Sequence, residues 1–295
     1  MSVLAVGTVA YDTISTPNAI KKNILGGSGT FFSIACSKFS EVKLIAVVGE
    51  DFNQKDTNTL YENKIDLSGF ETIKGKTFKW SGEYYGDDLK DRKTIDTQLN
   101  VLSDFHPKLS EKHKKSKYLF LANMSPETQL NVLNQFDSRP NLVVMDTMNF
   151  WIENNYDSLL KMINLVDVIL VDSGESTQIT GEKNINYAGE KLLQLGPQIA
   201  VIKQGGLGST IFNKNFRFSI PAYQVSEIVD PTGAGDSFAG GFLGYISRNT
   251  NYTEEVFKKA LKAGTILGSF AVESFSVNKL LNINLDDINF RIKNL

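Results

Sequence analysis

The residues best suited to chemistry lie together in segment 230–242, which reads Asp-Pro-Thr-Gly-Ala-Gly-Asp-Ser-Phe-Ala-Gly-Gly-Phe. Pro231 keeps the residue before it extended and cannot continue a helix. The aromatic residues that follow have the spacing of one helix face: Phe238, Phe242 and Tyr245. Thr232 to Gly235 therefore stand at a helix N-terminus, where free backbone N–H groups and the helix dipole favour a bound anion such as phosphate.

A carboxylate directly follows this expected anion site. Asp236 is placed to accept the proton of an attacking hydroxyl, a general-base role that contributes about 10²- to 10⁴-fold. An acidic residue in the first turn also stabilises an ordinary helix without any catalysis. Small residues extend the pattern at Ala239, Gly240, Gly241 and Gly244 and predict close helix packing, so we favour an active site.

This segment resembles the C-terminal signature of the PfkB family of carbohydrate kinases, the ribokinase-like group. In that family the last aspartate is the catalytic base and the amides before it hold the transferring phosphoryl group. The resemblance assigns the first role to Asp236 and the second to Gly233, Ala234 and Gly235, with Thr232 beside the nucleotide. The family often uses a monovalent cation here, which implies a K⁺ site at Asp230 with residues 272–276.

Two earlier motifs follow the order of the same family. Asp12 resembles its acceptor-binding aspartate, because a carboxylate can accept hydrogen bonds from two sugar hydroxyls. Gly26 and Gly27 resemble the double glycine at which the backbone approaches the acceptor. A loop aspartate and an ordinary turn are the alternative interpretations.

The acceptor itself is less defined by the sequence. Sugar kinases of the family commonly carry asparagines where this chain has Ala10 and Phe31, so hydrogen-bonding capacity is lost. The Phe31 ring would stack on a nucleobase, cover an apolar sugar face or pack in the core. Several polar and aromatic residues follow expected strands at the edge where α/β sheets bind ligands: Asn123, Asp146 and residues 149–151. They either line a pocket or pack in the protein interior.

Two further segments resemble nucleotide-binding motifs of the family. Asp172 and Glu175 match an Asn-x-x-Glu motif near magnesium and the phosphates, with aspartate in place of asparagine, and Glu175 would hold Mg²⁺ through water. A helix N-cap is the alternative. Lys203, Gly205 and Gly208 resemble a Thr-x-Gly-x-x-Gly nucleotide turn with lysine in place of threonine, and a plain turn between strands is the alternative.

The elements that must position these residues alternate along the chain. Short apolar runs predict buried parallel strands at residues 3–6, 44–48, 118–121, 142–145, 168–171 and 199–202. Segments with helical spacing lie between them, which predicts an α/β protein with a mostly parallel sheet covered by helices on both faces. The resemblance implies the ribokinase-like three-layer α/β/α sandwich with a small β-sheet lid.

One region breaks this alternation. Residues 76–101 change to period two around the polar turn 86–91, which predicts a β-hairpin. Its aromatic face must pack on the main domain, a second subunit or a ligand. We expect an α/β core of residues 1–10, 26–71 and 104–295 and a β lid of residues 11–25 and 72–103. The lid is also the expected contact of a homodimer.

Composition narrows the partners and the location. The 31 basic and 33 acidic residues are interspersed, which argues against nucleic acid. No stretch approaches the roughly 20 apolar residues of a membrane span. One cysteine and two histidines are too few for a Cys/His metal site and fit the cytoplasm. The basic stretch 108–115, which holds His113, predicts a solvated loop or helix face.

Together these patterns predict an ATP-dependent kinase that transfers the γ-phosphoryl group to a hydroxyl of a small sugar or a sugar-containing metabolite, with ATP, Mg²⁺ and K⁺ as cofactors. A nucleoside kinase of the same family is one alternative. A non-catalytic nucleotide- or sugar-binding regulatory protein is the other, and the intact Asp236 argues against it. A dinucleotide-binding enzyme is disfavoured because no Gly-x-Gly-x-x-Gly follows the first strand.

Overall fold

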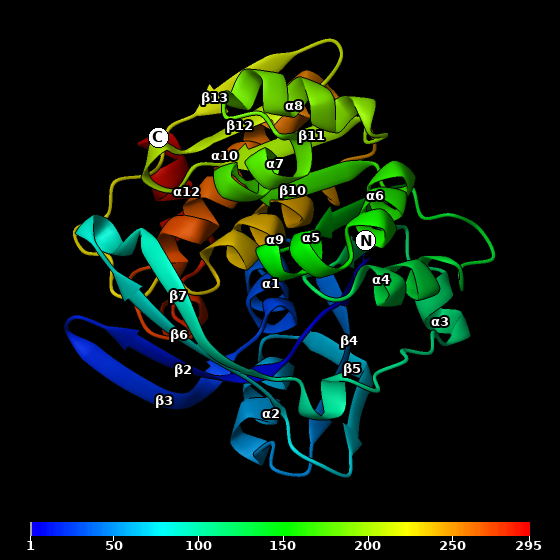
Figure 1. The fold of residues 1–295 in the computed structure, drawn as a ribbon, viewed down its shortest axis with the longest axis vertical. Helices are drawn as coiled ribbons and strands as arrows, with labels where there is room; N and C mark the ends of the chain where they lie inside the picture. The colour runs from blue at the N-terminus through cyan, green and yellow to red at the C-terminus, as the bar shows by residue number, and fades with distance from the viewer. Residues whose placement is uncertain (1) are drawn as a thin grey trace.

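Two β-sheets organise the protein, whose computed structural model describes residues 2–295 (Figure 1). The strands of the larger sheet are β1 (Ser2–Val6), β4 (Glu41–Gly49), β5 (Ile65–Ile73), β8 (Tyr118–Leu121), β9 (Leu142–Asp146), β10 (Val168–Asp172), β11 (Ile199–Lys203), β12 (Ser209–Phe212) and β13 (Arg217–Ile220). Their order across the sheet is β13-β12-β11-β10-β9-β8-β1-β4-β5, and neighbours are parallel except where β12 pairs with β11 and β13. Every apolar run predicted as a buried parallel strand belongs to this sheet.

Helices cover both faces of the larger sheet. Side chains alternate along each strand, so that Val3 and Ala5 enter one hydrophobic core while Leu4 and Val6 enter the other. The first core is completed by α1 (Ser28–Ser37), α2 (Gln54–Glu62), α9 (Ala234–Ile246), α10 (Glu254–Ala271), α11 (Asn278–Leu281) and α12 (Leu285–Lys293). The second is completed by α4 (Pro126–Leu133), α5 (Asn149–Asn154), α6 (Tyr156–Leu165), α7 (Ser173–Thr180) and α8 (Ile185–Gln194). The predicted three-layer architecture is confirmed.

Helix α9 lies close to two neighbouring helices because its sequence is rich in small residues. A methyl group added at Gly240 would lie 2.5 Å from the Phe32 carbonyl oxygen of α1, and one added at Gly241 would lie 2.6 Å from the Ala263 carbonyl oxygen of α10. Larger side chains at these positions would push the helices apart. The predicted close packing is confirmed, and it holds α9 between α1 and α10.

The smaller sheet, which we call the lid, lies to one side of the larger sheet (Figure 1). Its strands are β2 (Ala10–Thr16), β3 (Ala19–Gly26), β6 (Phe78–Tyr85) and β7 (Asp91–Gln98), in the order β3-β2-β6-β7. Strands β6 and β7 form the predicted antiparallel hairpin. The one-turn helices η1 (Asp87–Leu89) and η2 (Asn100–Leu102) flank β7, and η3 (Gly205–Leu207) follows β11. The division of the chain into core and lid domains stays a prediction.

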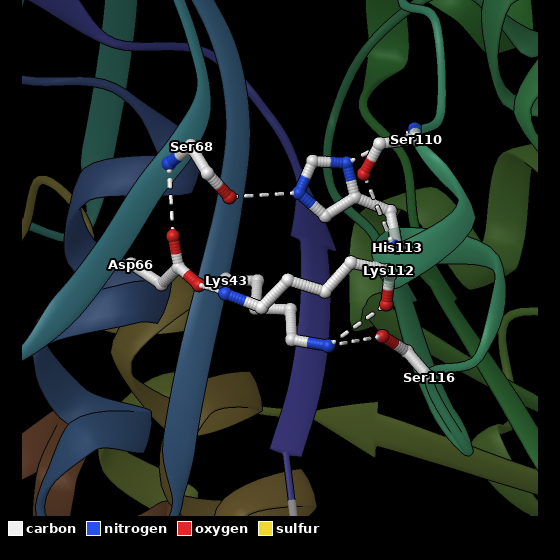
Figure 2. A network of polar contacts seen from close by, with 7 residues as sticks. All are labelled: Lys43, Asp66, Ser68, Ser110, Lys112, His113 and Ser116. Carbon is white, nitrogen blue, oxygen red and sulfur yellow. Dashed lines mark hydrogen bonds and ion pairs between the residues drawn. The ribbon is translucent and has the colours of Figure 1, made fainter.

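The basic stretch 108–115 is less solvated than its composition predicts, and the expectation is wrong at His113. This residue lies in the one-turn helix α3 (Glu111–Lys114) and is 2% exposed. Its Nε2 atom lies 3.1 Å from the Ser68 hydroxyl of β5, and Ser110 N–H donates to its Nδ1 atom over 3.3 Å (Figure 2). Beside it, Lys112 forms a 2.7 Å ion pair with Asp66. The imidazole faces inward because it bonds to the neighbouring strand.

Within residues 2–295, each helix is either too short or too polar to cross a membrane.

Candidate active site

The predicted site residues gather where strands of the larger sheet end. Asp146, Asp172 and Lys203 are the last residues of β9, β10 and β11, and α9 begins at Ala234 beside them. The carboxyl edge of a parallel sheet is where open α/β folds bind ligands, because the loops there converge. The structure therefore brings the phosphate-binding and carboxylate residues of the prediction to one edge.

The loop before α9, residues 230–233, has the geometry expected of an anion site. Gly233 is the N-cap of α9 and has φ 75°, a left-handed conformation that glycine adopts without strain. A methyl group added at Gly233 would also lie 2.3 Å from the ring of Phe31. Phe31 is 1% exposed and belongs to the core. Of the three interpretations of Phe31, the structure favours packing in the core, because its ring packs against Gly233 of the loop 230–233.

Asp236 lies in the first turn of α9 and is partly exposed. Burial and the negative charge of Asp146 raise its pKa to about 7, although the charges of Lys203 and Arg92 act in the opposite direction. A carboxylate with this pKa is an effective proton acceptor near neutral pH.

A cation stands next to the same helix turn. Lys203 Nζ lies 3.0 Å from Asp146 Oδ2, and a methyl group added at Gly235 would lie 3.1 Å from that Nζ atom. Burial lowers the pKa of Lys203, but the charges of Asp146 and Glu175 outweigh it and hold the ammonium charged. The predicted phosphate-neutralising lysine therefore lies beside the predicted anion-binding amides.

Asp12 and the double glycine, which the resemblance assigns to the acceptor, lie in contact with each other. Asp12 is 4% exposed, and a methyl group added at Gly26 would overlap its Oδ2 atom. Burial and the charge of Asp230 raise the pKa of Asp12 to about 8, and a hydrogen bond from the Gly27 amide acts against them. Gly27 is also the N-cap of α1 with φ 93°. Acceptor binding by these residues stays a prediction.

Asp172 and Glu175 form a helix capping box at the start of α7. The Glu175 N–H donates to Asp172 Oδ1 and the Asp172 N–H donates to Glu175 Oε2, each over 2.7 Å. The N-cap interpretation of this motif is confirmed. Burial and the charge of Asp172 raise the pKa of Glu175 to about 8. One oxygen of Glu175 is committed to the cap, and its contact with Mg²⁺ through water stays a prediction.

The segment after Lys203 turns from β11 into the antiparallel strand β12, as its alternative interpretation predicts. Gly205 has φ 56° and Gly208 has φ 98°, so both adopt left-handed backbone conformations. Their role in nucleotide binding stays a prediction. Asn123 lies after β8, where its Oδ1 accepts a 2.9 Å hydrogen bond from the Trp151 indole, which fixes both side chains at the sheet edge.

Asp230 fits the cation expected at this site. It is 1% exposed, and its Oδ1 atom accepts a 2.9 Å hydrogen bond from Thr232 N–H. Within residues 2–295 its Oδ2 atom is buried and makes no hydrogen bond of ordinary geometry, although the Ser276 amide acts on the same carboxyl. Burial raises the pKa of Asp230. Its backbone N–H and that of Val229 bond to the Val272 carbonyl, which places residues 272–276 nearby. A buried oxygen with a free lone pair is a suitable ligand for a monovalent cation.

Three residues of the lid lie near the site, and the sequence did not assign them to it. Thr232 donates a 3.2 Å hydrogen bond to the hydroxyl of Tyr84. Trp80 pairs with Asp12 in the register of β6 with β2, and Arg92 pairs with Tyr84 in the register of β7 with β6. The shared face of Trp80 and Tyr84 was a signal in the period-two pattern, but which element that face covers depends on the fold.

The three-layer fold, the amides at the start of α9 and the adjacent carboxylate define a kinase of small molecules. The sequence profile of the pfkB family of carbohydrate kinases matches residues 7–283, and the chain belongs to this family. Its members transfer a phosphoryl group to an alcohol of a sugar or a nucleoside.

Relatives agree with this assignment. The cytidine kinase of Thermococcus kodakarensis is 27% identical over 94% of this chain and 100% of its own. The fructokinase double mutant of Vibrio cholerae, solved with fructose, ADP and potassium ion, superposes with a TM-score of 0.82 at 18% identity over 99% and 98% of the chains. The aminoimidazole riboside kinase of Salmonella enterica, solved with its riboside and an ATP analogue, gives 0.77 at 19% identity over 99% and 100%.

Proposed function

We propose that the protein transfers the γ-phosphoryl group of ATP to a hydroxyl of a sugar-containing metabolite, with Asp236 as the general base. The observation that carries this proposal is the position of Asp236, which directly follows the amides of residues 233–235 and has a pKa raised to about 7. A proton acceptor and an anion site then serve the same reacting group.

The proposed transfer balances as follows. The acceptor hydroxyl gives its proton to a carboxylate oxygen of Asp236, and its oxygen forms a bond to the γ-phosphorus. The bond between the γ-phosphorus and the bridging oxygen breaks, and ADP leaves with that electron pair. Amides of residues 233–235 and the Lys203 ammonium stabilise the charge on the transferring group. Glu175 would hold Mg²⁺ through water, and the ion would supply charge neutralisation for the phosphates, while Asp230 would hold K⁺ beside the loop 230–233.

For the acceptor we propose a nucleoside first and a free sugar second. Asp12 would accept hydrogen bonds from the ribose hydroxyls. Trp80, its neighbour in strand register, is half-buried, and a methyl group added at Gly82 would touch its indole, so the ring lies flat along β6. An indole beside the sugar-binding carboxylate is suited to stack on a base. The similarity to a cytidine kinase over nearly the whole chain supports the same choice.

A substrate panel tests both parts of the proposal. ATP consumption is measured with pentoses, hexoses and nucleosides, and we expect the highest kcat/KM with a nucleoside. Trp80→Ala then raises the KM for that nucleoside by about 5- to 150-fold, since base–aromatic stacking contributes about 1–3 kcal/mol. Trp80→Phe retains a ring and is the control. If no acceptor in the panel leads to ATP consumption, the result would favour the non-catalytic binding protein. If the KM of Trp80→Ala equals that of the unmodified protein, the result would favour a sugar.

Two further features belong to this proposal. We propose that the protein acts in the cytoplasm, which its single buried cysteine, Cys36, supports. We also propose a homodimer through the lid, because β7 is an edge strand whose residues are all exposed and include Ile95, 57% exposed. Sedimentation of the protein measures the oligomeric state, and a monomer at micromolar concentration would contradict the dimer.

A further inference from the structure

A buried ion pair lies beside the proposed base. Lys203 at the end of β11 and Asp146 at the end of β9 approach to 3.0 Å across β10, and their side chains are 16% and 6% exposed. The desolvation cost of such a pair is comparable to its attraction, so a buried ion pair contributes little to stability relative to apolar residues of the same size. Its position at the carboxyl edge of the sheet points instead to a role in the site.

The pair holds a positive charge where anions bind. The Nζ atom of Lys203 lies within 3.1 Å of the place that a side chain on Gly235 would occupy, so the ammonium faces the first turn of α9. Backbone N–H groups in the first turn of a helix have no partner within the helix, although here the Ala234 N–H donates to the Pro231 carbonyl over 3.2 Å. Two sources of positive potential thus meet at one point, which suits the phosphates of a nucleotide.

Asp146 is fixed more firmly than the lysine that it holds. Its Oδ1 atom accepts a 2.7 Å hydrogen bond from Thr147 N–H, and its backbone carbonyl accepts a 3.1 Å hydrogen bond from Gln129 Nε2. Gln129 is 1% exposed and also donates to the Ala122 carbonyl over 3.0 Å. Gln129 therefore fixes the backbone of Asp146 to the end of β8 and the Thr147 amide orients the carboxylate, whereas the lysine has a flexible four-carbon stem.

Besides Asp146, Lys203 has two carboxylates within electrostatic reach, Glu175 at the start of α7 and Asp236 in α9. Its charge lowers the pKa of Asp236, while the charge of Asp146 raises it, so the three groups interact. Two further charged side chains interact with Asp236. The charge of Arg92 in the lid lowers the pKa of Asp236, and the charge of Asp236 raises the pKa of Asp12 in β2. An ammonium paired with Asp236 would make that carboxylate a weaker base.

We propose that Asp146 is a positioning residue for phosphoryl transfer, a role that rests on the proposed function. Asp146 holds the Lys203 ammonium beside the start of α9 and prevents it from pairing with Asp236. Lys203 then binds the phosphates of ATP, and Asp236 keeps its capacity to accept the hydroxyl proton.

Asp146→Asn tests this role with two readouts. The pKa of Asp236, followed by carboxyl ¹³C NMR in the protein without substrate, falls by about one unit or more, the effect of an opposite charge at close range. The acid limb of the kcat profile moves to lower pH by the same amount, and kcat falls about 10-fold or more. The NMR measurement does not depend on turnover.

A double-mutant comparison identifies the path of the effect. Lys203→Met removes the ammonium, and Asp146→Asn in that background changes kcat by less than about threefold, because coupled residues are non-additive. Asp167→Asn is the control: it breaks a 2.9 Å ion pair with Arg139 before β10, at the opposite end of the strands, and we expect the pKa of Asp236 to stay unchanged.

The outcomes separate the two proposals. The charge of Asp146 acts on Asp236 directly, so the fall in the Asp236 pKa is compared between the unmodified and the Lys203→Met backgrounds. A fall that is no larger in the unmodified background overturns the positioning role, and so does a loss of kcat of more than about threefold on adding Asp146→Asn to Lys203→Met. Absence of turnover by the unmodified protein with every acceptor contradicts the proposed function alone, since the difference between the two NMR shifts still reports whether Asp146 holds the ammonium away from Asp236.

Discussion

The hydroxyl of Thr232 donates a hydrogen bond to the hydroxyl of Tyr84 over 3.2 Å, and this contact joins the loop before α9 to the lid. Tyr84 is 6% exposed, so the bond is shielded from water. The two residues lie 148 positions apart in the sequence. The lid and the anion site are therefore positioned together, which gives the lid a direct part in forming the site.

Removal of the Tyr84 hydroxyl tests this connection. Tyr84→Phe leaves the ring in place and deprives Thr232 of its acceptor, a loss of about 0.5–1.5 kcal/mol. We expect the KM for the acceptor to rise about 2- to 12-fold if the whole bond contributes to binding. Steady-state kinetics measure it. Tyr85→Phe, at the next residue and 47% exposed, is the control and leaves KM unchanged. If Tyr84→Phe and Tyr85→Phe have the same KM for the acceptor, the Thr232–Tyr84 contact does not contribute to forming the site.

The raised pKa of Asp236 predicts the pH dependence of catalysis. The base acts in its ionised form, and burial with the charge of Asp146 raises its pKa to about 7. Activity therefore falls about tenfold per unit as the pH decreases below that value and levels off above it. A pH profile of kcat/KM between pH 5 and about 9 measures this. A profile that stays flat down to pH about 5, as the ordinary aspartate pKa of about 3.9 would give, would show that the carboxyl is not perturbed.

Much of this site follows from local sequence signals. The strand runs and the start of α9 depend on periodicity and on proline and glycine spacing, which act over a few residues, whereas the pairing of Asp12 with Gly26 and Gly27 came from the resemblance to the family. The position of Phe31 does not: an aromatic residue on a helix faces a ligand or a core according to what packs on it, and here Gly233 packs on it.

Two contacts depend entirely on tertiary structure. Asp146 and Lys203 form an ion pair because their strands, β9 and β11, lie on either side of β10. The sequence of neither strand predicts this order. His113 stands in a basic stretch that predicts solvent exposure, yet a bond to Ser68 draws it inward. Polar residues bury when a partner satisfies them, and the partner lies far away in the sequence.

The burial of His113 predicts a pH dependence of stability. Burial, together with the charges of Lys43 and Lys112, lowers its pKa in the folded state. In the unfolded chain this histidine binds a proton near pH 6.5, whereas in the folded protein it binds one only at lower pH. The free energy of unfolding therefore decreases as the pH falls below about 6.5. Figure 2 shows the bonds that hold the neutral ring.

His113→Gln should remove this part of the pH dependence. Urea unfolding at pH about 7.5 and about 5 measures the change for the unmodified protein and the variant. His106→Gln, at the exposed second histidine, is the control and keeps the full dependence. A variant at position 113 that loses as much stability on acidification as the unmodified protein would contradict the assignment.

Asp236 is proposed to accept the proton of the acceptor hydroxyl at the anion site. Single-turnover transfer by Asp236→Asn, with ATP binding measured by calorimetry, tests it most directly because the substitution removes the base and keeps the size of the side chain. We expect the single-turnover rate constant to fall at least about 10²-fold while the Kd for ATP stays within about threefold. Transfer within about threefold of the unmodified protein would contradict the assignment of Asp236 as the base.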